Sequence, residues 1–181
     1  MLDIENFDKV FERLVSSKEF KKLQDMFNKA EHVFYFGHGG NMAIAEHAAI
    51  DASRLTDKNV KAPGGGTLVT SIQSDFSFDE WILNWLRMST KGLDKSKCLA
   101  IGLSCSLNSK SANAIVTGLN WADENGIDCC MVSAQYNPCG NSKIVKVVQN
   151  VKNYHTSELL SLALTYQLIH GAGFKCPSII R

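Results

Sequence analysis

Short apolar runs alternate with longer helical stretches along this chain, and this alternation constrains the fold more than any other feature. Strands separated by helices are typical of parallel sheets, because two parallel strands need a crossover connection. The sequence therefore predicts an α/β fold, a three-layer sandwich with a central parallel sheet flanked by helices. The predicted strands are 32–37, 97–104, 127–134 and 146–151, and the predicted helices of this core are 42–55, 79–89, 111–125 and 157–173.

Two further segments complete the predicted organisation. Residues 3–30 carry apolar side chains at helical spacing, which predicts one or two amphipathic helices before an α/β core over about 31–181. Residues 60–75 contain Pro63, three glycines and then TLVTSI, a pattern that favours a turn followed by a strand. No repeat, low-complexity tract or linker interrupts the chain, so residues 1–181 are expected to form a single domain.

Composition excludes several classes of function. Nineteen basic residues against 18 acidic ones leave no surplus charge for a phosphate backbone, which argues against nucleic-acid binding. No apolar run approaches the roughly 20 residues of a membrane span. The N-terminus lacks the basic and apolar regions of a signal peptide, and the six cysteines contain no CxxC pair. We therefore expect a cytoplasmic protein with reduced cysteines and no membrane partner.

The first predicted strand ends in a glycine-rich turn, Gly37–Asn41, that leads directly into a helix. Glycines allow a tight turn and expose N–H groups at a helix N-terminus, which suits an anion or a sugar hydroxyl. Glycines placed only for the turn are an equally simple interpretation. Met42 breaks the GxGxxG pattern, so a nucleotide-dependent oxidoreductase is disfavoured.

A second junction, at residues 103–115, is rich in serine. Ser104, Ser106 and Ser109 follow a strand and precede a helix, so their hydroxyls and the nearby N–H groups predict a phosphate cradle. An ordinary polar loop, with Ser109 or Ser111 as the N-cap, is the alternative. Three serines in six residues exceed what a cap needs, and phosphate binding is therefore favoured.

Together these motifs resemble the sugar isomerase (SIS) domain, and its phosphoheptose isomerase branch in particular. The segments GHGGNMAIAEH and LSCSLNS carry the resemblance, which extends over nearly the whole chain. It implies a flavodoxin-like sandwich and a phosphorylated sugar as the small-molecule partner. It also implies that a phosphate is held by the serine loop and that sugar hydroxyls are held nearby. The implied substrate-binding residues are Asn41, Asp75, Ser104, Cys105 through its backbone, Ser106 and Ser109.

The family's helical His-x-x-x-Glu pair corresponds here to His47 and Asp51. Their i, i+4 spacing places both side chains on one helix face, where they could act on a substrate or share a divalent metal such as zinc. Asp51 is the candidate base, and His47 the group that polarises the carbonyl. His155 or His38 would return the proton to oxygen.

The last helix departs from the family pattern. The family has a glutamine and, eight residues later, a histidine, where this chain has Ser157 and Thr165. A hydroxyl cannot replace imidazole as a proton shuttle at neutral pH. The chain is therefore interpreted as an aldose–ketose isomerase similar to sedoheptulose 7-phosphate isomerase. A non-catalytic SIS protein that binds a phosphosugar or has a regulatory role is the alternative.

Apolar residues surround almost the whole circumference of the predicted last helix, 157–173. A helix at the edge of an α/β domain ordinarily buries one stripe, so the pattern predicts contact with another chain. The resemblance implies a homotetramer, and a dimer is the fallback.

Overall fold

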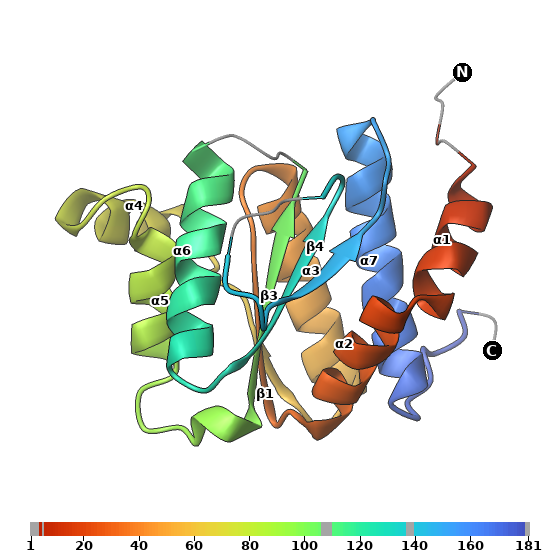
Figure 1. The fold of residues 1–181 in the computed structure, drawn as a ribbon. Helices are drawn as coiled ribbons and strands as arrows, with labels where there is room; N and C mark the ends of the chain where they lie inside the picture. Colours follow the sequence, from red (N-terminus) through yellow and green to blue (C-terminus); the bar gives the residue numbers. More distant parts are fainter. Residues whose placement is uncertain (1–3, 5, 106–109, 137–139, 180–181) are drawn as a thin grey trace.

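One parallel sheet of five strands forms the centre of the structure, a computed structural model that describes residues 4, 6–105, 110–136 and 140–179. The strand order is β2-β1-β3-β4-β5, and every neighbouring pair is parallel (Figure 1). The predicted parallel sheet is thus confirmed. The strands are β1 (His32–Phe36), β2 (Asn59–Lys61), β3 (Cys98–Ser104), β4 (Asp128–Ser133) and β5 (Val145–Val148).

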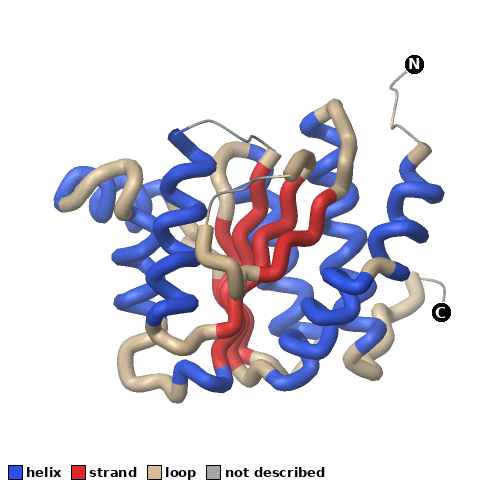
Figure 2. The backbone as a smooth tube through the Cα atoms, in the orientation of Figure 1, coloured by secondary structure: helices blue, strands red, loops and turns tan. Residues whose placement is uncertain are grey.

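Helices cover both faces of the sheet, which makes the three-layer sandwich that the sequence predicts (Figures 1 and 2). A short 3₁₀ turn, Lys95–Lys97, precedes β3. On one face lie α1 (Phe7–Ser16), α2 (Lys18–Lys29), α3 (Gly40–Leu55) and α7 (Tyr154–Gly171). On the other face lie α4 (Gly66–Asp75), α5 (Trp81–Ser89) and α6 (Lys110–Glu124).

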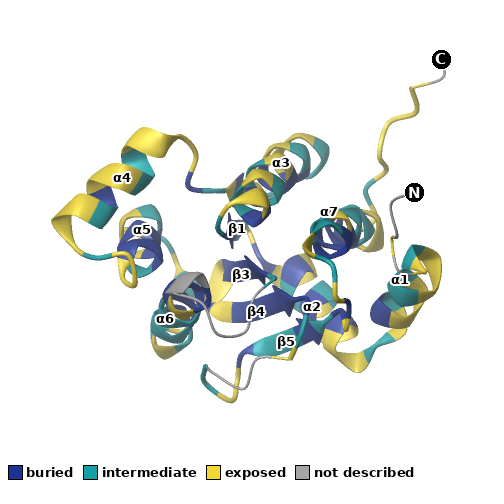
Figure 3. Cartoon of the chain, turned by 90° about the horizontal axis from the view of Figure 1, so that it is seen from above, coloured by how far each residue is buried: buried dark blue, intermediate teal, exposed yellow. Residues whose placement is uncertain are grey.

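Alternating side chains of β1 show why this run forms a central strand. Val33 and Tyr35 belong to the core beneath α1, α2, α3 and α7, whereas Phe34 and Phe36 belong to the core beneath α5 and α6. Successive side chains of a strand point to opposite faces, so a strand buried on both faces is apolar throughout. Both cores are visible as buried segments when the molecule is viewed from above (Figure 3).

The apolar circumference of α7 is covered mainly within the same chain. Helices α1, α2 and α3 pack around it, and its inner side chains Leu160, Leu164 and Leu168 are buried in the shared core. Leu159 remains 46% exposed. The apolar pattern of this helix therefore does not require a second chain, because the N-terminal helices supply most of the cover.

The prediction of a strand in TLVTSI is wrong, because this segment forms α4. Leu68, Val69 and Ile72 lie at helical spacing and pack toward α5. Gly64 and Gly65 both have a φ of +59°, a conformation that favours glycine, and they turn the chain away from the sheet. The edge strand that pairs with β1 is the shorter Asn59–Lys61, which precedes Pro63.

The strand order indicates where a candidate site lies. The chain leaves β1 through α3 toward β2 at one edge, and leaves β3 through α6 toward β4 on the other side. In open parallel sheets, ligands bind outside the carboxyl ends of the strands where the order reverses. Here this switch point lies between β1 and β3. The glycine turn, Gly37–Asn41, follows β1, and the serine loop begins at Ser104, the last residue of β3. No helix in the described part of the chain has the length and hydropathy of a membrane span.

Candidate functional site

The turn after β1 depends on two of its glycines. Gly39 has a φ of +56°, which a residue with a side chain adopts only with strain. Gly40 begins α3, and the carboxyl group of Glu158 from α7 packs against it. A Cβ there would lie 2.1 Å from Glu158 Oε1. The turn therefore brings α7 against the N-terminus of α3, where a carboxylate is favoured by the helix dipole.

Three elements meet at the switch point through Cys105. The side-chain amide of Asn41, at the start of α3, donates to Cys105 Sγ at 3.1 Å. The thiol of Cys105 donates in turn to the backbone oxygen of Tyr154, the first residue of α7, at 3.7 Å. The turn after β1, the end of β3 and the N-terminus of α7 are thus joined at the carboxyl edge of the sheet.

Five buried polar side-chain atoms at this edge have no hydrogen-bond partner among the described residues. They are His38 Nδ1, Asn41 Oδ1, Gln149 Oε1, Thr156 Oγ1 and Ser157 Oγ. Buried polar groups are almost always satisfied, so such atoms mark places where water or a ligand is expected. Donors and acceptors occur together in this set, which suits a ligand that carries hydroxyl groups.

His38 is held by the aromatic residues of the opposite layer. Trp81 Nε1 donates to His38 Nε2 at 2.8 Å, and the ring of Phe78 stacks on the imidazole at 5.0 Å between centroids. An indole nitrogen only donates, so Nε2 accepts and the proton of the neutral imidazole is on Nδ1. Burial lowers the pKa of His38 below its usual value. His38 therefore presents a neutral N–H donor at the switch point.

This arrangement predicts a pH effect on stability. Because the pKa of His38 is lowered in the folded state, the unfolded chain binds the proton more readily, and the free energy of unfolding falls as the pH drops below about 6.5. His38→Gln should reduce this pH dependence, measured by urea unfolding between about pH 7.5 and pH 5. His170→Gln, at the exposed end of α7, is the matched control and should behave as wild type. Equal pH dependence in the His38 variant and wild type would contradict the prediction.

The predicted phosphate cradle lies only in part within the described residues. Ser104 is the last residue of β3 and is buried, and Cys105 follows it, half-buried. Ser106 and Ser109 lie outside the described residues. The structure thus places the beginning of the serine loop at the switch point, beside the glycine turn.

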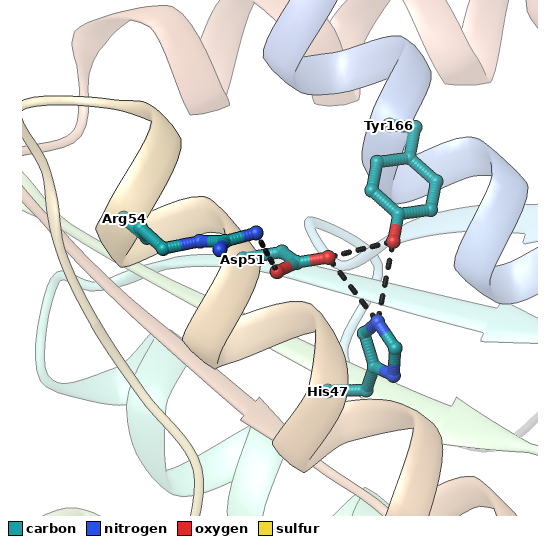
Figure 4. A network of polar contacts seen from close by, with 4 residues as sticks. All are labelled: His47, Asp51, Arg54 and Tyr166. Carbon is teal, nitrogen blue, oxygen red and sulfur yellow. Dashed lines mark hydrogen bonds and ion pairs between the residues drawn. The ribbon is translucent and has the colours of Figure 1, made fainter. Parts of the chain in front are cut away.

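His47 and Asp51 form a cluster of polar contacts with α7, further along α3 (Figure 4). Tyr166 donates its hydroxyl to Asp51 Oδ2 at 2.6 Å. His47 Nε2 lies 3.1 Å from the same carboxylate oxygen and 3.2 Å from the Tyr166 hydroxyl oxygen. Arg54 donates to the other oxygen, Asp51 Oδ1, at 3.1 Å. Asp51 is thereby enclosed by three partners, whereas the His47 side chain is 55% exposed.

These contacts shift the acidity of both oxygen groups. The hydrogen bond from Tyr166, with smaller contributions from His47 and Arg54, lowers the pKa of the Asp51 carboxyl. The same hydrogen bond raises the pKa of Tyr166 to about 12. The carboxylate is therefore stabilised in its charged form, and the phenol in its neutral form.

The cluster does not provide a zinc site within one chain. Catalytic zinc usually takes three protein ligands, and no group of three His, Cys, Asp or Glu side chains comes together among the described residues. Both oxygens of Asp51 are already hydrogen-bonded, one of them to the guanidinium of Arg54. A nearby cation disfavours the binding of a second one, so the donor set does not fit the divalent metal considered from the sequence.

Comparison with solved structures identifies the fold. The phosphoheptose isomerase of Neisseria gonorrhoeae superposes with a TM-score of 0.74 at 15% identity, covering 94% of this chain and 92% of that one. The sugar isomerase domain of the RpiR transcription factor of Sphaerobacter thermophilus gives 0.57 at 17% identity, covering 92% and 83%. The chain has the sugar isomerase fold. The NanR protein of Vibrio vulnificus, solved in complex with ManNAc-6P, gives 0.60 at 14% identity, covering 88% and 55%. In sequence alone, no family profile and no curated protein matches the chain.

Within this sugar isomerase fold, two predicted site residues lie apart from the cluster. Asp75 is exposed at the end of α4, an arm that projects on the side of the molecule away from α7 (Figures 1 and 3). His155 lies in the first turn of α7, half-buried, with its ring against Tyr154. The structure therefore places His155 at the carboxyl edge of the sheet, near Asn41. Within one chain, Asp75 does not come close to either residue.

The last helix presents different residues to α3 from those aligned by sequence. Ser157 and Thr165 are buried, and Thr165 bonds to the hydroxyl of Tyr35 at 3.4 Å, so these positions face the sheet. Glu158 and Tyr166, which are also eight residues apart, contact α3 instead. Tyr166 was not singled out by sequence, because within an apolar helix it looked like one more core residue. The signal that could have identified Tyr166 in the sequence is its polar hydroxyl in a helix that is otherwise rich in leucine.

Proposed function

We propose that this protein is a phosphosugar isomerase, similar to sedoheptulose 7-phosphate isomerase, that moves a proton between adjacent carbons through an enediolate. The observation that carries the proposal is the cluster of His47 and Asp51 on the α3 face toward α7, in a chain with the sugar isomerase fold. It supplies an exposed imidazole backed by a carboxylate. Such a pair is what abstraction of a carbon-bound proton requires.

Binding and chemistry use different parts of α3. The serine loop, at Ser104 and Cys105 together with Ser106 and Ser109, would hold the sugar phosphate, and Asn41 beside it would contact the sugar hydroxyls. His47 lies six residues further along the helix, about 9 Å at 1.5 Å per residue. The phosphate would thus anchor one end of the substrate while its carbonyl end reaches the cluster. Such an anchor contributes positioning rather than chemistry.

The unpartnered polar atoms support a polyhydroxylated substrate. His38 Nδ1 offers a donor, and Asn41 Oδ1 an acceptor, at the edge where the sugar would lie. His155 is at the same edge and is proposed to return the proton to the substrate oxygen. No step in this scheme consumes a redox cofactor, because isomerisation conserves the oxidation level of the sugar as a whole.

A non-catalytic phosphosugar-binding protein is the second candidate. The observation in its favour concerns the last helix, where Ser157 and Thr165 replace the glutamine and histidine of the family. Both side chains are buried against the sheet, and neither offers an imidazole for proton transfer. The solved neighbours include the sugar isomerase domain of a transcription factor. Such a protein would bind the phosphosugar without converting it.

One experiment separates the two candidates. Pentose, hexose and heptose phosphates are incubated with the purified protein, interconversion is followed by NMR, and binding is measured by calorimetry. The isomerase proposal expects turnover of at least one aldose–ketose pair. Binding that Ser106→Ala weakens by about 1–2 kcal/mol, with no interconversion of any substrate, would instead establish the binding protein.

Assembly is also proposed from the resemblance. The protein is expected to be a homotetramer, with a dimer as the fallback, and exposed apolar side chains such as Ile50, which is 67% exposed, are available for contacts between copies. Light scattering at micromolar concentration should give about four times the 20.0 kDa mass of one chain. A monomer mass at that concentration would contradict the prediction.

A further inference from the structure

The contacts among Asp51, His47 and Tyr166, which meet between α3 and α7, determine which atom of each side chain carries a proton. Tyr166 Oη and Asp51 Oδ2 are only 2.6 Å apart, and His47 Nε2 lies within 3.2 Å of both (Figure 4). A carboxylate only accepts hydrogen bonds, and a hydroxyl has a single hydrogen to donate. The short contact uses that hydrogen, so the Tyr166 oxygen can only accept from His47.

His47 Nε2 therefore faces two acceptors and must carry the proton. A neutral imidazole has one N–H group, which leaves the lone pair on Nδ1. No group among the described residues is bonded to Nδ1, and more than half of the His47 side chain is exposed. The basic atom of the cluster is thus the one that a ligand can reach.

The carboxylate of Asp51, in contrast, is less available to accept a proton from a ligand. Its oxygens accept from Tyr166, His47 and Arg54, and the bond from Tyr166 is the largest cause of its lowered pKa. Both oxygens of Asp51 are thus engaged, whereas Nδ1 of the exposed His47 has no partner among the described residues, so the imidazole is the better placed of the two to accept a proton from a ligand. The expectation from sequence, with Asp51 as the base and His47 as the polarising group, is the less suitable division of roles.

We propose that His47 is the base of this site through Nδ1, that Asp51 holds it as the Nε2–H tautomer, and that Tyr166 is a positioning residue that fixes both. The inference rests on the proposed isomerase function. His47 Nδ1 takes the proton from the carbon next to the substrate carbonyl, so the C–H bond breaks and an N–H bond forms. The electron pair passes into the enediolate. The proton then returns from Nδ1 to the carbon that carried the carbonyl, while the proton of the neighbouring hydroxyl passes to the former carbonyl oxygen, the transfer proposed for His155. No further reactant is consumed.

The tautomer can be measured without any substrate. Nitrogen-15 NMR of the histidine side chains distinguishes a protonated ring nitrogen from one with a free lone pair, at a pH well above the usual imidazole value of about 6.5. In wild type, His47 should show a protonated Nε2 and an unprotonated Nδ1. The opposite assignment, or an averaged mixture of both tautomers, would overturn the proposal even if no variant folds.

Variants test the role of the phenol. Tyr166→Phe should shift His47 toward a mixture of tautomers and lower kcat on the order of tenfold, the equivalent of one hydrogen bond, with KM little changed. Tyr136→Phe, which changes an exposed tyrosine in the segment between β4 and β5, is the matched control and should leave both readouts at wild-type values. An unchanged tautomer and unchanged kcat in Tyr166→Phe would overturn the assigned role.

The two proposals fail in different ways. Turnover by a protein whose His47 carries its proton on Nδ1 would overturn this inference and leave the isomerase function intact. The expected tautomer in a protein that converts no sugar phosphate would overturn the isomerase function, and with it the role of His47 as a base.

Discussion

Replacing His47 with glutamine should lower kcat for phosphosugar interconversion by about 10²- to 10⁴-fold, the usual contribution of a general base. Glutamine keeps a polar side chain on α3 but has no atom that takes up a proton near neutral pH. The affinity for the sugar phosphate should change little, because the proposed phosphate site lies at the other end of the substrate, near Ser104. The experiment measures kcat and KM on the best substrate of the panel, together with binding by calorimetry.

Two controls accompany the His47 variant. His170→Gln changes an exposed histidine at the end of α7 and should keep the wild-type rate. Circular dichroism and thermal unfolding should show that the His47 variant is folded, as expected for an exposed side chain. Retention of the wild-type kcat by His47→Gln would remove the imidazole from the mechanism.

Trp81→Ala should destabilise the protein by about 3–5 kcal/mol, the largest stability effect that we expect of a single substitution near the site. Trp81 is fully buried beneath the switch point, in the core that joins the sheet to α5 and α6. Its removal leaves a cavity and also deprives His38 Nε2 of its donor. Trp81→Phe, which keeps an aromatic ring but loses the N–H group, should cost less.

Trp121→Ala is the matched control for this prediction. Trp121 is half-buried in α6 and lies beside the side chains of Lys95 and Arg87, at 5.2 and 5.9 Å from the ring. Its truncation exposes little core, so the loss of stability should be clearly smaller. Urea unfolding followed by far-ultraviolet circular dichroism gives both values. A Trp81 variant that loses no more stability than the Trp121 variant would show that the contact with His38 and the core beneath it contribute little.

The sequence by itself determined four of the five strands and the edge of the sheet at which the candidate site lies. The run at 33–36 is hydrophobic and buried at every position, and a strand buried on both faces requires this composition. The glycine turn after it marks the carboxyl edge, and the serine-rich run after β3 marks the neighbouring strand. The spacing of His47 and Asp51 placed both on one face of α3, because four residues are close to one helical turn. These features are local, so no partner distant in the chain is needed to interpret them.

Tertiary structure decided what local pattern left open. The β-branched residues of TLVTSI are compatible with either a strand or a helix, and packing against α5 made them a helix. Tyr166 reaches Asp51 across 115 residues of chain, and Trp81 reaches His38 across 43. Only the packing of α7 on α3, and of α5 beneath the turn, brings these donors to their acceptors. The sequence therefore supplied the groups capable of acid–base chemistry, and the fold decided which atom of each carries the proton, because a tautomer depends on the partners that surround it.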